Sequence, residues 1–190
     1  MKGKRLLYTL RLWMIPSGVK RAQFLKEKKV FAGIGKGCSI SSRKIPLYAN
    51  LIRMGDNVHL ASDVVFVTHD ITHKMLNNSH LEALGQEKIQ EKVGCIELGD
   101  NVFVGAGSTI LYDVKIGSNV IIGAGSIVTK DIPDNSIAVG IPARVISTMD
   151  SYVGKRLAEE TYPASMRPQK QEVGQSLEAW CWEKFEEKHK

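Results

Sequence analysis

A six-residue repeat restricts the fold of this sequence more than any other feature. Every sixth residue from position 98 is aliphatic: Leu98, Val104, Ile110, Ile116, Ile122 and Val128. Glycine follows four of these positions, and the period recurs upstream at Met54, Leu60 and Phe66. A short strand with an inward aliphatic side chain, followed by a tight corner, explains this period, and three hexapeptides complete one triangular coil. The sequence therefore predicts an all-β parallel β-helix with coils at 54–71, 98–115 and 116–133.

The repeat is interrupted between residues 66 and 98, which are not a multiple of six apart. The excess is a polar stretch from Thr72 to Cys95, and an apolar prism core cannot hold it. We therefore expect 72–95 to protrude as a long loop. Two extra residues and Pro46 mark a smaller irregularity between 40 and 54.

These limits predict three regions: a basic helical segment at 1–29, the β-helix at 30–150 and a tail at 151–190. In the tail, Ser176 is a candidate N-cap for a short C-terminal helix. Leu177, Cys181 and Phe185 would then lie on one face of that helix.

Positive charge is concentrated at the N-terminus. Residues 1–29 contain nine Lys or Arg and only Glu27 as an acid, so the rest of the chain has a net charge of −2 against +6 overall. This distribution argues against a nucleic-acid surface across the fold. Five apolar residues recur there at helical spacing: Leu6, Leu7, Leu10, Trp13 and Met14.

Three interpretations of that apolar spacing stay open. A helix packed on the body of its own protein is favoured. A basic amphipathic helix against an anionic membrane is the second. A signal peptide is the third, disfavoured by Arg11 and by the lack of an Ala-x-Ala site. The apolar runs are all much shorter than the roughly 20 residues that span a bilayer.

The cysteines and histidines bear on location and on metals. Cys38, Cys95 and Cys181 are far apart and odd in number, which favours a reducing cytoplasm and argues against a thiolate zinc site. Four histidines, His59, His69, His73 and His80, raise the alternative of a zinc enzyme of the carbonic-anhydrase type. Stacked coils relate residues 18 apart, and none of these four is so spaced, so no metal is expected.

His69 lies at a coil corner directly before the predicted loop. Histidine titrates near neutral pH and suits the role of general base. Position alone leaves this role and that of an exposed corner histidine equally open.

The stretch 54–147 resembles the hexapeptide-repeat acyltransferases, specifically the O-acetyltransferase branch with galactoside, maltose and polysaccharide acetyltransferases. The motifs that carry this resemblance are Gly55-Asp56-Asn57-Val58, Thr68-His69-Asp70, the run from Gly99 to Ala106, the run from Ile122 to Pro133, and Gly140-Ile141-Pro142-Ala143-Arg144. Upstream, the segments at 17–21 and 34–37 look like members encoded for capsule or exopolysaccharide assembly. The resemblance implies left-handed coils and a homotrimer with active sites between subunits.

The resemblance also implies an acetyl-CoA-dependent O-acetyltransferase with a sugar or polysaccharide precursor as acceptor. His69 would be the general base, and the backbone N–H of Ala106 would stabilise the oxyanion. Asn50 and Asp70 would bind the acceptor. The residues that would contact CoA are Phe103, Ala106, Ala124, Thr129, Lys130, Pro142 and Arg144. Phe103 stands where tryptophan is common in such enzymes, and Ser147 where some members have a second arginine.

Other functions stay open on the same fold. Serine O-acetylation, amino-sugar N-acetylation and antibiotic acetylation would use the same donor. A catalytically silent binding scaffold is a further alternative. The expected location is the cytoplasm, with residues 1–29 as a candidate peripheral contact to the inner face of the plasma membrane.

Overall fold

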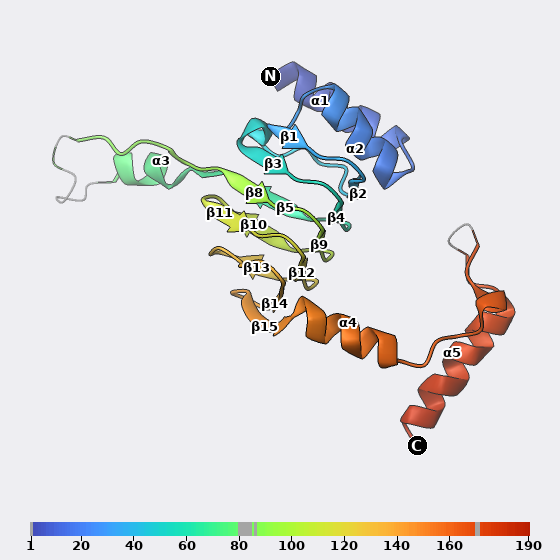
Figure 1. Ribbon diagram of the computed structural model, residues 1–190. Coiled ribbons are helices and arrows are strands. Elements are labelled where there is room, and N and C mark those ends of the chain that lie inside the picture. The colour runs from blue at the N-terminus through green and yellow to red at the C-terminus, as the bar shows by residue number, and fades with distance from the viewer. Residues whose placement is uncertain (1, 80–84, 86, 170–171) are drawn as a thin grey trace. The chain divides into compact units, whose positions relative to one another are not determined.

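The computed structural model describes residues 2–79, 85, 87–169 and 172–190. The chain forms two compact units, residues 1–152 and 153–190. The first unit contains the repeat, and its strands stack in successive layers (Figure 1).

Short parallel strands form three sheets, which are the three faces of a prism. The first face is β1 (Gly33–Ile34), β3 (Ile52–Met54), β8 (Ile96–Leu98) and β11 (Val114–Ile116). The second is β2 (Ser39–Ile40), β4 (Val58–Leu60), β9 (Val102–Val104), β12 (Val120–Ile122), β14 (Ser136–Val139) and β15 (Arg144–Thr148). The third is β5 (Val65–Val67), β10 (Thr109–Leu111) and β13 (Ile127–Val128). The predicted β-helix is confirmed, with β15 antiparallel as its last strand.

The strand register follows the predicted period with three departures. Val102 pairs with Val120, 18 residues on, whereas Val58 pairs with Val102, 44 residues on, so 26 extra residues enter at the loop. Ser39 pairs with His59, which confirms the two extra residues near Pro46. The coil predicted to run from 116 to 133 without interruption is shorter, because Ile116 bridges to Ile132 after only 16 residues. The corner after Val128 loses two residues, and Pro133, which has no N–H, follows directly.

The aliphatic residues of the repeat fill the prism. Leu98 is 1% exposed, and the other five residues of that series are fully buried. Close backbone approach explains the glycine after each of them. A Cβ at Gly105 would lie 2.4 Å from the Ala124 nitrogen, closer than real Cβ atoms come to any other residue.

One prism corner is built from an asparagine ladder. Asn57, Asn101, Asn119 and Asn135 all have φ near +56°, a left-handed conformation that asparagine tolerates better than most residues. Each side-chain amide donates to the next in the stack, at 2.9–3.0 Å. The Gly-Asp-Asn-Val motifs that include Asn57 and Asn101 therefore form the corner itself.

Two helices precede the β-helix, α1 (Lys2–Met14) and α2 (Gly18–Glu27). Helix α2 buries Arg21, Ala22 and Leu25. The favoured interpretation of the first helix is wrong in one respect: its five spaced apolar residues point outward, and the helix packs through Leu12 instead. The spacing identified an apolar face correctly, but a different and narrower face of the same helix meets the core.

The predicted loop is an arm that leaves the prism (Figure 1). Its base is an antiparallel ribbon of β6 (His69–Asp70) and β7 (Lys92–Val93), and α3 (Thr72–Asn77) follows β6. The Asn77 side chain joins the two limbs, donating to Ile89 O at 2.8 Å and accepting from Ile89 N at 2.9 Å.

The second unit contains η3 (Ala164–Met166) and α5 (Gln175–Lys188), and α4 (Met149–Ala158) leads into it. Helix α5 begins after Gly174, so the prediction of Ser176 as N-cap is wrong. Leu177 is buried, but Cys181 and Phe185 are exposed, so the predicted apolar face packs only at its first position. Among the described residues, no helix combines the length and the apolar character needed to cross a bilayer.

Candidate active site

His69 is half-buried at the base of the arm, where the third face of the prism turns toward the first. The ring of Tyr48 meets the His69 ring edge-on, with centroids 5.1 Å apart. Tyr48 Oη donates to the Glu91 carboxylate at 3.3 Å, and the negative charge of Glu91 raises the pKa of Tyr48. The Nδ1 atom of His69 is buried without a hydrogen-bond partner in the described part of the chain. The corner thus holds the imidazole ring in place and leaves one of its nitrogens unpaired.

The Asp70 carboxylate ties the arm to the neighbouring coil. Its Oδ1 accepts from the Thr72 hydroxyl at 2.7 Å and the Thr72 N–H at 3.1 Å, and its Oδ2 accepts from Tyr112 Oη at 2.9 Å. These donors, the Thr72 hydroxyl first, lower the pKa of Asp70 because they favour its charged form. Both oxygens already have partners, so Asp70 positions the chain on either side of His69.

The residues predicted for the site lie along two edges of the prism. The corners after β5, β10 and β13 form one edge, called here the His69 edge, which carries His69, Tyr112, Thr129 and Lys130. Thr129 and Lys130 are exposed on it. Stacking of the coils therefore brings the predicted base close to one pair of the predicted CoA contacts.

The second edge, called here the Ala106 edge, is made of the corners 61–64, 105–108, 123–126 and 140–143. Ala106 and Ala124 are exposed on it, and the Ala106 carbonyl accepts from Gly125 N at 2.8 Å. Towards the described residues, the Ala106 N–H donates no hydrogen bond. Pro142 and Arg144 follow at the end of β14. The third face separates this edge from the His69 edge, so one chain does not bring the predicted base and oxyanion donor together.

Two further predicted residues lie on neither cluster. Phe103 projects from the second face, 45% exposed, beside His59 on the adjacent strand. Asn50 is exposed in η1 (Ala49–Leu51), two residues after Tyr48. Asn50 therefore lies on the same turn as the aromatic side chain that packs against His69.

Sequence reasoning missed Tyr48, Glu91 and Tyr112 at this site. Their partners lie 42 or 43 residues away in the sequence, so no local pattern signals these contacts. The coil register itself could have found Tyr112, because it occupies the corner that stacks directly on the corner of His69.

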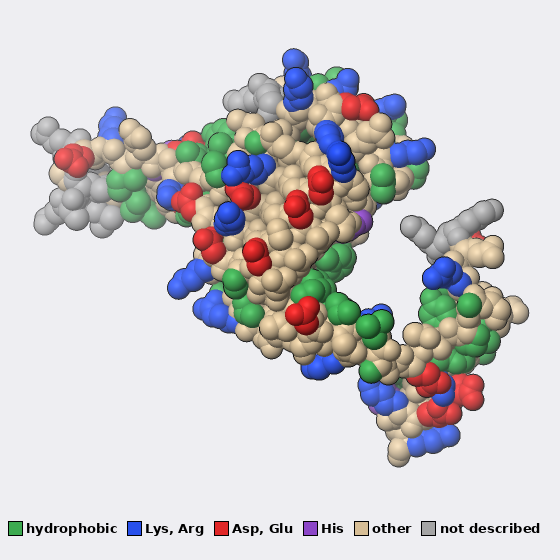
Figure 2. Space-filling model, in the orientation of Figure 1, with side chains coloured by type: hydrophobic (Ala, Val, Ile, Leu, Met, Phe, Trp, Pro, Cys, Tyr) green, Lys and Arg blue, Asp and Glu red, His purple; other side chains and the backbone are tan. Residues whose placement is uncertain are grey.

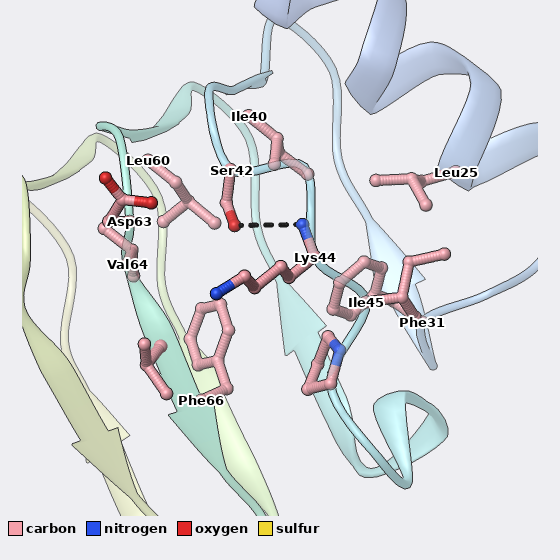
Figure 3. A pocket seen from close by; sticks show the side chains of 12 residues that line it. Leu25, Phe31, Ile40, Ser42, Lys44, Ile45, Leu60, Asp63, Val64 and Phe66 are labelled. Atoms are coloured by element: carbon pink, nitrogen blue, oxygen red, sulfur yellow. Dashed lines mark hydrogen bonds between the residues drawn. The ribbon is translucent and has the colours of Figure 1, made fainter. Parts of the chain in front are cut away.

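A cavity of about 290 Å³ opens elsewhere on the first unit, beside β5 (Figure 3). Mostly apolar side chains line it, including Leu25, Phe31, Leu60 and Phe66, and the Lys44 side chain extends over it. It forms where residues 41–47 cover the third face irregularly instead of adding a strand below β5.

No cluster of three or more His, Cys, Asp or Glu side chains that could hold a metal occurs among the residues that the structure describes. His80, one of the four histidines considered above, lies outside them.

Comparisons with known proteins agree with this architecture. Residues 96–130 match the family model described as bacterial transferase hexapeptide (six repeats). Protein CapG of Staphylococcus aureus is 36% identical over 140 residues, which cover 72% of this chain and 77% of that protein. A maltose O-acetyltransferase from Clostridium difficile 630 is 30% identical, with 76% and 86% coverage and a TM-score of 0.50.

A hexapeptide-repeat acetyltransferase from Vibrio cholerae, solved with acetyl coenzyme A, shares the fold at 18% identity and a TM-score of 0.55, with 77% of this chain and 86% of that chain covered. The chain belongs to the hexapeptide-repeat acyltransferases. Its fold is accordingly the left-handed parallel β-helix that the resemblance implied.

Proposed function

We propose that this chain transfers the acetyl group of acetyl-CoA to a hydroxyl of a sugar or polysaccharide precursor. The relationships to CapG and to a maltose O-acetyltransferase support an oxygen acceptor on a carbohydrate. The acetyl-CoA complex of the Vibrio cholerae protein supports the donor, because that protein has the same fold.

The unpaired nitrogen of His69 carries this proposal. Its ring is packed against Tyr48, and the buried Nδ1 has no partner among the described residues. A histidine with a free ring nitrogen at a defined corner can take a proton from a bound hydroxyl, and such a base contributes about 10²–10⁴-fold to the rate.

The reaction then follows from two groups. His69 removes the acceptor hydroxyl proton as that oxygen attacks the thioester carbonyl, and the carbonyl oxygen becomes an oxyanion that the Ala106 N–H stabilises. When the intermediate collapses, the C–S bond breaks and the imidazolium returns its proton to the CoA thiolate. The products are the acetyl ester and CoA with a free thiol.

Because the two groups lie on different edges, the proposal includes a homotrimer with active sites between subunits. The His69 edge of one subunit would face the Ala106 edge of the next. The separation of the two edges by the third face supports this arrangement, since it prevents one chain from completing the site.

Further residues have assigned roles in this proposal. Arg144 suits the phosphates of CoA because its planar fork matches phosphate oxygens. The other proposed donor contacts are Phe103, Ala106, Ala124, Thr129, Lys130 and Pro142, and Asn50 and Asp70 border the acceptor. We propose a cytoplasmic location, supported by three free cysteines.

The test is acetyl-CoA-dependent release of CoA over a panel of sugars, oligosaccharides, serine and amino sugars. We expect acceptor-stimulated release in the wild type and its loss, by about 10²-fold or more, in His69→Ala. His73→Ala is the matched control, because His73 lies four residues on and also has an unpaired, buried Nδ1.

Each outcome decides between the alternatives. Stimulation by serine or an amino sugar alone would contradict the carbohydrate hydroxyl as acceptor. Loss of activity in His73→Ala but not in His69→Ala would contradict the assigned base. Binding of acetyl-CoA without transfer to any acceptor would favour a silent scaffold.

A further inference from the structure

Helix α1 presents an apolar face to solvent. Leu6, Leu7, Leu10, Trp13 and Met14 are 57–66% exposed, although all five are large and apolar. At 100° per residue they occupy an arc of about 120° on one side of the helix. A continuous exposed face of this kind marks an interaction surface more often than a chance exposure of single residues does.

The opposite side of the same helix is anchored. Leu12 is 1% exposed, and the Tyr8 ring meets Phe24 of α2 edge-on at 5.6 Å. The buried Arg21 guanidinium fixes the turn after α1, because Nη1 donates to Ile15 O at 2.6 Å and Nε donates to Ile40 O at 2.8 Å. The apolar face is therefore held outward by the fold, and the helix cannot turn it inward without breaking these bonds.

Positive charge borders this face. The helical geometry puts Lys4 and Arg11 at one border of the apolar arc. The Arg43 guanidinium lies 5.4 Å from the Trp13 ring centroid. Residues 1–26 contain no acidic residue. Figure 2 shows Lys and Arg side chains projecting at the end of the first unit that α1 and α2 form.

We propose that α1 docks on an anionic bilayer surface, with its five apolar side chains among the headgroups and its cations on the lipid phosphates. Leucines and a tryptophan between basic residues match the chemistry of that interface. A second copy is the less suitable occupant, since two such surfaces face to face would oppose nine cations with nine. The proposal does not rest on acetyl transfer, so the two can fail separately.

The experiment is co-sedimentation of the full-length protein with vesicles of phosphatidylcholine and phosphatidylglycerol, compared with phosphatidylcholine alone. We expect binding to the mixed vesicles, little to the neutral ones, and a decrease as the salt concentration rises. The double variant Leu10→Ser, Trp13→Ser should lower the partition coefficient at least about tenfold. Both side chains are exposed, so circular dichroism should show the same fold.

Trp182→Ser is the matched control, because Trp182 is 59% exposed and lies on the acid-rich helix α5. We expect it to bind vesicles like the wild type. Three results would overturn the proposal: wild-type protein that binds neutral and anionic vesicles equally or not at all, a double variant with unchanged partition, and a double variant that changes the oligomeric state without lipid. The last result would identify the face as a contact between subunits.

Discussion

At the scale of single residues, the Asp70 carboxylate makes a pH-dependent contribution to stability. Its pKa is lower in the folded chain than in the unfolded one, because Thr72 and Tyr112 donate to the charged form. A carboxyl group of this kind stabilises the fold at pH values above its unfolded pKa, and the contribution is lost as the pH falls through the folded pKa.

Tyr112→Phe removes one of these donors and keeps the ring beside Lys92. We expect the pKa of Asp70 to rise toward its ordinary value, as followed by carboxyl NMR titration. In urea unfolding the variant should be less stable than the wild type at neutral pH, and the difference should shrink in acid. A difference that is the same at both pH values would show that the hydroxyl acts independently of the Asp70 charge.

Tyr48 is expected to position His69. Tyr48→Phe keeps the edge-on contact with the imidazole and loses only the bond to Glu91, whereas Tyr48→Ala loses both. We expect Tyr48→Ala to lower kcat about ten- to a hundredfold with little change in the KM for acetyl-CoA, because a displaced base loses reactive geometry. Tyr48→Phe should retain most of the activity. Equal losses in the two variants would assign the effect to the hydroxyl instead.

At the scale of elements, the asparagine ladder makes a separable prediction. Asn101→Ala removes two side-chain hydrogen bonds and puts alanine at a φ of 56°. We expect a loss of about 2–3 kcal/mol in the free energy of unfolding. Asn101→Gly loses the same bonds without the backbone penalty, so it should be less destabilised. If glycine were as costly as alanine in chemical denaturation, the conformational part of this argument would be wrong.

The elements also separate what the sequence can predict from what it cannot. The period that ends in Ile122 and Val128 predicts the strands, their faces and their register, because one inward side chain per hexapeptide has to be buried. The protruding arm follows from the same period, since polar residues cannot enter the prism. The orientation of α1 does not follow, because its two faces are both apolar enough to pack, and only the contacts of Leu12 and Arg21 decide between them.

The candidate site divides in the same way. The corner position of His69 is readable from the repeat, but its contact with Tyr48 and the link from Tyr48 to Glu91 depend on how the arm returns to the prism. The placement of Ala106 and His69 on different edges follows from the strand register, 18 residues per coil, once the strands are known. It is this separation that gives the whole molecule its clearest test.

At the scale of the whole molecule, a site shared between subunits predicts complementation between two inactive chains. His69→Ala removes the base from the His69 edge. Ala124→Trp fills the Ala106 edge, where Ala124 is small and exposed, and should block the donor. Each variant alone should be inactive while remaining folded and trimeric by light scattering.

When the two variants are unfolded and refolded together in equal amounts, their subunits mix. An intact site then needs His69 from one chain type and an open Ala106 edge from the other, so activity should return to about a quarter of the wild-type level. Mixing the variants without refolding provides the control, because trimers that do not exchange subunits stay inactive. If refolded mixtures that contain mixed trimers remain inactive, both edges of each site belong to one chain, and the arrangement between subunits is wrong.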